Sequence, residues 1–122
     1  TAHLGHTWLR TDEWYSFRSN PRTTVQVLLS LYEGTYVGGT MGDHPIAWYH
    51  EFEGGRSWYT GGGHTSSSYA EPDFVRHLLG GIQYATGMVA APAVPIPAVV
   101  ASSIMDAAAI SPARRIGPVP PT

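Results

Sequence analysis

Two residue types are missing from this 122-residue sequence: it contains no cysteine and no lysine. Without cysteine the chain has no disulfide, no thiolate metal site and no cysteine nucleophile, although the redox compartment is left open. The seven basic residues are all arginines, and nine acidic residues bring the formal net charge to -2. Because nucleic-acid binding normally needs a basic patch, this balance argues against a nucleic-acid partner. No apolar run approaches the ~18 residues of a membrane span, so we expect no membrane partner either.

What the sequence does contain is enough apolar material for one packed domain, since 43% of its residues are hydrophobic and 11% aromatic. The composition changes at Met88, beyond which seven of the ten prolines and nine alanines fall with no sustained period. We therefore predict a domain over residues 1–87 and an Ala/Pro-rich, disordered tail or linker over residues 88–122. Within that tail, only Ser102–Ile110 suits a short helical piece.

The rest of the chain is organised around a predicted β-hairpin. Ile46–Phe52 and Ser57–Thr60 are rich in aromatic and β-branched residues, and Glu53–Arg56 between them supplies the glycines of a hairpin turn. Glycine-rich stretches precede and follow the hairpin, and each ends in a histidine.

The two histidines at the open end of this hairpin, His44 and His64, are predicted to lie close together. If Glu53 pairs with Arg56, Pro45 falls opposite His64, and residues opposite each other have Cα atoms roughly 4.5–5.5 Å apart. The imidazoles would then be able to share one ligand, unless Pro45 ends the pairing early.

A buried strand and an amphipathic helix complete the predicted elements. Val25–Leu31 is apolar almost throughout, as is typical of a strand in the middle of an α/β sheet. Ser66–Ser68 and Glu71–Asp73 supply polar residues for a helix start, with Pro72 suited to the first turn. The helix is predicted to bury the apolar residues that recur at helical spacing: Phe74, Val75, Leu78, Leu79, Ile82 and Ala85.

The segment Asp12-Glu13-Trp14-Tyr15 places two acids beside two large aromatic residues. A carboxylate held against aromatic rings is partly desolvated and becomes a candidate general acid, and the indole of Trp14 becomes a candidate stacking surface. The alternative is that an acid caps a backbone turn while the rings fill the core. We favour the cap for Asp12 and leave both interpretations open for Glu13.

Among the histidines, His64 is our first candidate for a functional role. It follows Gly61–Gly63 directly after a strand, where open α/β sheets build their ligand crevices, and the glycines would leave room for a substrate. The alternative is that His64 only orders its loop. The histidines at 3, 6, 50 and 77 are predicted to be structural. Asp43, next to His44, is predicted to have a separate role because adjacent side chains of an extended chain point to opposite faces.

These motifs, read in order as RTDEWY, NPR, VLLSLYEGTY, GDHPIAWYHEFEGGR, GGGHT and RHLLGGIQYATG, resemble the C-terminal half of a trehalose-utilisation (ThuA-like) domain. The resemblance covers about His3–Gly87. It implies an α/β fold: part of a flavodoxin-like sheet with flanking helices, similar to class I glutamine amidotransferases. It also implies a crevice that contains Glu13, Trp14, His44 and His64, and an association with carbohydrate use, often in fusion with other carbohydrate-active modules.

The same resemblance implies that the N-terminal strands of such a domain are missing here. We therefore expect open sheet edges and a tendency to form homo-oligomers. It leaves the compartment open between cytoplasmic and secreted.

Three functional hypotheses follow. The first is a domain that processes a sugar or oxidised sugar derivative, with Glu13 and His64 as acid/base groups, Trp14 or Trp48 as a stacking surface and His44 as a further substrate contact. The second is a non-catalytic carbohydrate-binding or structural module that uses the same crevice. The third is a zinc-assisted hydrolase with His44 and His64 as ligands; the other two require no cofactor.

Overall fold

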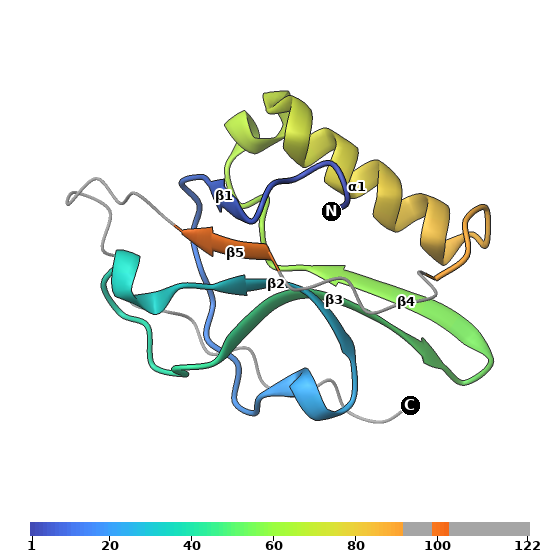
Figure 1. Cartoon of the computed structure of the whole chain (residues 1–122), viewed down its shortest axis with the longest axis horizontal. Coiled ribbons are helices and arrows are strands. Elements are labelled where there is room, and N and C mark those ends of the chain that lie inside the picture. The colour runs from blue at the N-terminus through green and yellow to red at the C-terminus, as the bar shows by residue number, and fades with distance from the viewer. Residues whose placement is uncertain (92–98, 103–122) are drawn as a thin grey trace.

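The computed structural model describes residues 1–91 and 99–102, and it has the predicted α/β fold. A five-stranded sheet in the order β1-β5-β2-β3-β4 carries one α-helix within the described residues (Figure 1). β5 is parallel to β1 and β2, whereas β2, β3 and β4 are antiparallel. In chain order the elements are β1 (Thr7–Leu9), the 3-10 helix η1 (Pro21–Thr23), β2 (Gln26–Leu31), η2 (Glu33–Thr35), β3 (His44–Phe52), β4 (Gly55–Thr60), η3 (Ser66–Ala70), α1 (Pro72–Ala85) and β5 (Val99–Ser102).

The hairpin of β3 and β4 forms as predicted, but its register differs from the predicted one. Phe52 pairs with Gly55, so the turn consists of Glu53 and Gly54 alone, with φ angles of 49° and 78°. Two positive φ values are what a tight two-residue hairpin turn requires. Glu51, rather than Glu53, lies opposite Arg56, and the ladder ends at Ala47 and Thr60. The prediction that Pro45 falls opposite His64 is therefore wrong.

β2 lies in the middle of the sheet, between β5 and β3, although it is less buried than predicted. Leu29 and Leu31 are buried, whereas Val27 and Leu28 are only half-buried. The pairing with β3 also contains an irregularity around Leu28. The core forms where these strands meet the N-terminal segment and the helix, and its buried residues are Trp8, Trp14, Leu29, Leu31, Ile46, Ala47 and Phe74.

β5 belongs to the stretch that the sequence analysis assigned to a tail. Val100 pairs with Thr7 of β1, and Val99 pairs with Leu29 of β2. Sequence analysis did not predict this strand because prolines are frequent around it. Val99–Ser102 itself contains no proline and suits a strand. Residues 92–98 and 103–122, which include most of the predicted helical piece Ser102–Ile110, lie outside the described residues. The predicted domain boundary at residue 87 therefore stays a prediction.

The helix α1 begins at Pro72, as its sequence predicts, but it buries a different face. Phe74 is fully buried, and the other residues turned inward are His77, Gly81 and Tyr84. A Cβ atom at Gly81 would lie 2.3 Å from the Trp58 ring, so only glycine allows this close approach to β4. Four residues of the predicted apolar face are instead exposed, namely Val75, Leu79, Ile82 and Ala85.

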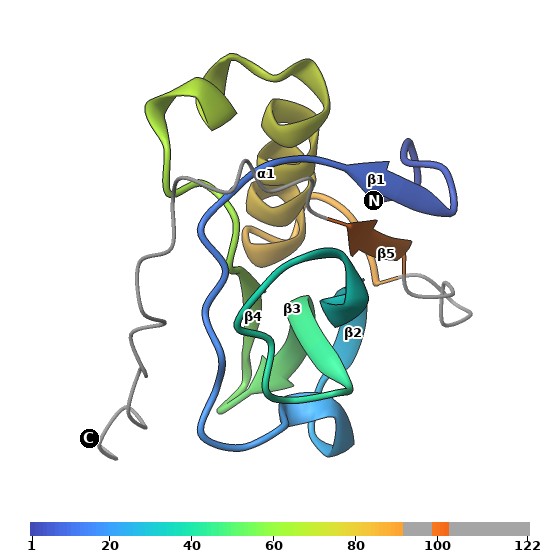
Figure 2. The same ribbon diagram turned by 90° about the vertical axis from the view of Figure 1, so that its left-hand side faces the viewer.

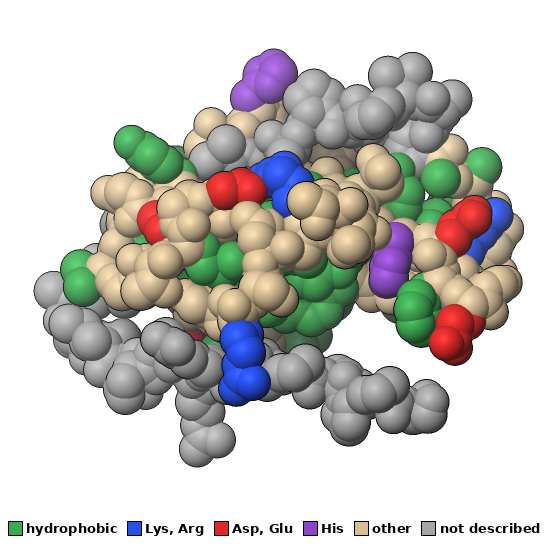
Figure 3. All heavy atoms as spheres, turned by 90° about the horizontal axis from the view of Figure 1, so that it is seen from below, with side chains coloured by type: hydrophobic (Ala, Val, Ile, Leu, Met, Phe, Trp, Pro, Cys, Tyr) green, Lys and Arg blue, Asp and Glu red, His purple; other side chains and the backbone are tan. Residues whose placement is uncertain are grey.

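The N-terminal segment completes the molecule on a second side. After β1 it runs along the sheet and passes close to the loop that follows β4 (Figure 2). Figure 3 shows the face of the sheet that is turned away from α1, where hydrophobic side chains gather centrally and the visible arginines lie apart from one another. No helix in the described part of the chain has the length and apolar character of a membrane span.

His77 illustrates how fully the helix is anchored on β4. Its Nε2 atom lies 3.0 Å from the Thr60 hydroxyl, and its ring contacts Trp58 and Trp8. Burial, together with the positive charges of the N-terminus, Arg10 and His3, lowers the pKa of His77 to about 3. His77 is therefore neutral in the folded protein near neutral pH, as a structural histidine would be.

We predict that this burial makes the fold acid-sensitive. Above pH 6.5, the ordinary pKa of histidine, neither state binds a proton at His77; below it, the unfolded state binds one and the folded state does not. Stability should therefore fall as the pH drops from 6.5 towards 3, by up to about 1.4 kcal/mol per pH unit from this residue. Urea unfolding at several pH values in this range gives the free energy of unfolding, which should depend less on pH for His77→Asn than for the original protein. An equal pH dependence in the two proteins would contradict the prediction.

We also predict that adjacent leucines of α1 differ in their effect on stability. Leu78 packs against the core, whereas Leu79 is 52% exposed. Leu78→Ala should cost about 2 kcal/mol of unfolding free energy, and Leu79→Ala at most about 0.5 kcal/mol. Urea unfolding of the two matched variants measures the difference. A larger loss for Leu79→Ala would mean that the helix buries the side that carries Leu79.

Candidate functional site

The segment between β1 and η1 sorts its side chains by alternation. Asp12, Trp14 and Ser16 are buried, whereas Glu13 and Tyr15 between them are partly exposed. Successive side chains of an extended chain point to opposite sides, so the segment presents one set to the core and the other to solvent.

The buried carboxylate of Asp12 fixes the loop that follows β4. It accepts hydrogen bonds from the backbone amides of Gly63 at 2.7 Å and His64 at 3.0 Å, and from its neighbour Glu13 at 2.9 Å. Its side chain has no exposed surface. The cap that we favoured for Asp12 is therefore present, and its target is a loop some fifty residues away in the sequence.

Arg10 neutralises this buried charge. Its Nη2 atom lies 3.1 Å from an Asp12 oxygen and donates to the Ser68 hydroxyl at 2.9 Å and to Glu71 at 3.3 Å. The guanidinium also lies over the Phe74 ring, 4.3 Å from its centroid. A buried charge pair needs such additional hydrogen bonds to offset its desolvation. Sequence analysis did not single out Arg10, because an arginine next to a polar turn carries no distinctive signal.

The three glycines before His64 serve the core rather than a substrate. A Cβ atom at Gly61 would lie 2.5 Å from Ile46, and one at Gly62 would lie 2.6 Å from Arg10. Gly63 has φ +98°, and a Cβ there would lie 2.9 Å from Phe74. The space that these residues free is thus occupied by the protein's own side chains, which corrects the prediction that it receives a substrate.

Glu13 and His64, which the sequence analysis proposed separately, form a direct pair. The Nε2 atom of His64 lies 2.7 Å from a carboxylate oxygen of Glu13, and its Nδ1 atom lies 3.2 Å from the Tyr15 hydroxyl. The side chain of His64 is 48% exposed and that of Glu13 is 31% exposed. This imidazole–carboxylate pair is therefore accessible from the solvent. Sequence analysis did not assign a role to Tyr15, although it lies two residues after Glu13 and so on the same side of an extended segment.

His44, by contrast, is 1% exposed and is held within the protein. Its Nε2 atom donates to the Tyr15 carbonyl at 3.0 Å, and its Nδ1 atom lies 2.8 Å from Glu33 and 2.9 Å from the Tyr36 hydroxyl. The structure does not bring His44 to an open surface beside His64, so it corrects the placement that underlies the predicted substrate contact.

Glu33 uses the same carboxylate to order the glycine-rich loop before β3. It accepts hydrogen bonds from the amides of Met41 at 2.9 Å and Gly42 at 2.8 Å. Burial by itself would raise the pKa of Glu33, but these amides and His44 outweigh it and hold the pKa below its ordinary value. Asp43 has a separate role, as predicted from alternation: it pairs with Arg22 at 2.6 Å, which lowers the Asp43 pKa.

The residues do not fit the zinc site of the third hypothesis. Both ring nitrogens of His44 are engaged with protein groups, and no lone pair is left for a metal. Across the described ranges, no three histidine, aspartate or glutamate side chains are grouped to hold a metal ion.

The aromatic residues divide between core and surface. Trp14 is 9% exposed and belongs to the core, so its burial does not suit the stacking role predicted for it. Trp48 is half-buried and stacks on Tyr59 with ring centroids 4.2 Å apart. Tyr15 is close enough to Tyr59 to contribute to its raised pKa, after the larger effect of burial. Tyr69, 57% exposed, donates its hydroxyl to the Gly63 carbonyl at 3.2 Å.

Comparison with known proteins identifies the family of the chain. A family model described as ThuA, trehalose utilisation, matches residues 1–85. The chain belongs to the ThuA family. The match confirms the resemblance derived from the motifs and spans the Asp12 segment, the hairpin and the His64 loop. At the level of the family, it associates the chain with trehalose utilisation. No curated protein and no solved structure matches the chain.

We predict that Asp12→Asn strongly destabilises this ThuA domain. The amide removes the buried counter-charge of Arg10, which keeps only the partly exposed Glu71 at 3.3 Å, and it replaces one oxygen that accepts from the His64 loop, so the loss should be about 3–5 kcal/mol. Asp43→Asn removes the same charge from an exposed pair and should cost at most about 1 kcal/mol. Urea unfolding compares the two. Similar losses would show that the Asp12 network is not central to the fold.

Proposed function

We propose that this ThuA domain processes a sugar or oxidised sugar derivative by proton transfer, with His64 and Glu13 as the acid/base pair. The observation that carries the proposal is the contact of 2.7 Å between two partly exposed side chains on separate, internally fixed segments. A pre-positioned imidazole and carboxylate are suited to give and take protons near neutral pH.

The geometry favours a defined direction of proton transfer. With Glu13 ionised, the short contact holds a proton on Nε2 of His64, and the lone pair of the neutral ring lies on Nδ1, facing the Tyr15 hydroxyl. Once the Tyr15 hydroxyl turns from Nδ1 to the substrate, a substrate proton would pass to Nδ1, and Glu13 would stabilise the resulting imidazolium. Tyr15 would orient the ring and donate a hydrogen bond to a substrate oxygen.

An oxidised sugar suits this pair better than an ordinary glycoside. Most glycosidases use two carboxyl groups set roughly 5–9.5 Å apart, whereas Glu13 is here in direct contact with an imidazole. Oxidation of a sugar hydroxyl to a ketone makes the adjacent C–H bond acidic enough for a base of this type. When the base removes that proton, the C–H electron pair forms a C=C bond to the next carbon, the C–O bond at that carbon breaks, and the departing oxygen takes a proton from the imidazolium of His64.

The neighbouring aromatic surface supplies a place for the sugar ring. Trp48 and Tyr59 stack on each other on the face of the sheet turned away from α1, and Tyr15 connects this pair to His64. Aromatic rings bind the apolar faces of sugar rings, while hydroxyl groups accept polar contacts. This arrangement supports Trp48 as the stacking residue in preference to Trp14.

The direct test is hydrogen exchange at carbon. The protein is incubated in D2O with a hexose disaccharide oxidised to a ketone, and NMR measures deuterium next to the carbonyl and any released sugar. Exchange above the buffer rate is the expected result. Binding without exchange or product would instead favour a non-catalytic carbohydrate-binding module.

We predict that His64→Gln lowers exchange or turnover by about 10²- to 10⁴-fold without unfolding the domain, because it removes an acid/base group from an exposed position. His6→Gln is the matched control and should retain full activity, since His6 is exposed and lies outside the site. His77 is unsuitable as a control because it is buried. Full activity of the His64 variant would refute its role and leave Glu13 to be tested.

A further inference from the structure

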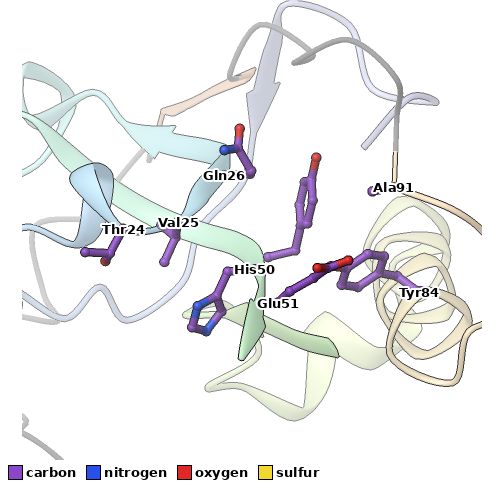
Figure 4. Close-up of a pocket in the computed structure, with 8 residues that line it drawn as sticks. Thr24, Val25, Gln26, His50, Glu51, Tyr84 and Ala91 are labelled. Atoms are coloured by element: carbon purple, nitrogen blue, oxygen red, sulfur yellow. The ribbon is translucent and has the colours of Figure 1, made fainter. Parts of the chain in front are cut away.

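A second concave site lies on the opposite face of the sheet, at the far end of the hairpin. It is an open cleft of about 480 Å³ that Gln26, Tyr49, Glu51, Tyr84 and Ala91 line. Gln26 pairs with Tyr49 in the sheet, and Glu51 follows two residues later, so the three side chains emerge on the same face as α1. Figure 4 shows Gln26, Glu51 and Tyr84 around the cleft, which Thr24, Val25 and His50 also line.

The cleft is distinct from the Glu13 and His64 site. Glu51 is seven residues from His44, at the other end of β3, which corresponds to roughly 20 Å of extended strand. The two sites also lie on different faces, because Tyr49 contacts Tyr84 of α1 whereas Trp48 does not face the helix. A ligand in one site therefore does not touch the residues of the other.

Two tyrosines give the cleft an aromatic wall. The rings of Tyr49 and Tyr84 meet edge to face with centroids 4.9 Å apart. Tyr84 is 7% exposed and is held by the helix, so this wall is rigid. Burial raises the pKa of Tyr84, and the nearby Glu51 carboxylate raises it further, so the phenol stays protonated and able to donate a hydrogen bond.

The side chains opposite this wall can form hydrogen bonds, and the one acidic side chain among them has an arginine as its cross-strand partner. Gln26 offers an amide and Glu51 a carboxylate, and both side chains are exposed. Arg56 is the cross-strand partner of Glu51, and its guanidinium lies 5.4 Å from the centroid of the Tyr84 ring. The Arg56 guanidinium donates to the Val89 carbonyl at 2.8 Å rather than to Glu51, but one carboxylate and one guanidinium at this end of the hairpin carry no net charge, which favours a neutral ligand.

We propose that this cleft is a binding site for a neutral saccharide, separate from the acid/base site and not dependent on the proposed reaction. Its volume lies in the range of small-molecule sites. The tyrosine wall matches the apolar face of a sugar ring, and an amide, a carboxylate and a phenol match its hydroxyl groups.

The test uses the full chain and two-dimensional amide NMR with glucose and a glucose disaccharide as probes. The expected result is saturable shifts at Gln26, Tyr49 and Glu51. Gln26→Ala and Glu51→Ala should each weaken the affinity about three- to tenfold. Gln83→Ala, which changes the same residue type on α1 outside the cleft, should leave the affinity unchanged.

Two further measurements separate this proposal from the proposed reaction. His64→Gln should leave the shifts at the cleft intact, whatever its effect on turnover. The proposal is overturned by an absence of saturable shifts, by shifts confined to the His64 loop, or by unchanged affinity in both cleft variants. Tighter binding of choline or citrate than of either sugar would also overturn it, because the cleft would then select charge.

Discussion

The structure depends on one buried charge pair. Asp12 and Arg10 bring an N-terminal segment, the loop after β4 and the start of α1 into a single network, because the carboxylate accepts two loop amides and the guanidinium reaches Ser68 and Glu71. Hydrogen bonds to both Asp12 oxygens and from the Arg10 Nη2 atom offset part of the desolvation of this pair, whereas the Arg10 Nε atom is buried without a partner. The backbone amide of His64 is bound to the buried Asp12 carboxylate, and its side chain points to the exposed side.

The candidate site thereby has a simple construction. Residues that face inward along the Asp12 segment fix the scaffold, and residues that face outward from it meet His64. A catalytic pair needs both partners held in position before a substrate arrives. Here the two partners come from segments that the buried network already ties together.

The sequence was most informative where local rules decide the outcome. The hairpin and the start of α1 at Pro72 follow from turn residues and helix N-terminal signals, whereas only the capping character of Asp12, and not its target loop, could be predicted from a short polar side chain. It was least informative where tertiary contacts decide. Helical periodicity cannot tell that Gly81 and His77 face Trp58, and a histidine beside a glycine-rich loop looks the same whether it is exposed, as His64 is, or buried, as His44 is.

One residue also joins the two glycine-rich loops that frame the hairpin. The Tyr15 carbonyl accepts a hydrogen bond from His44, and the Tyr15 hydroxyl contacts His64. His44 in turn contacts Glu33, which orders the loop before β3. The loops are therefore mechanically coupled. A displacement of either loop shifts the Tyr15 backbone or ring, so the orientation of the exposed imidazole reports on a part of the chain that it never touches.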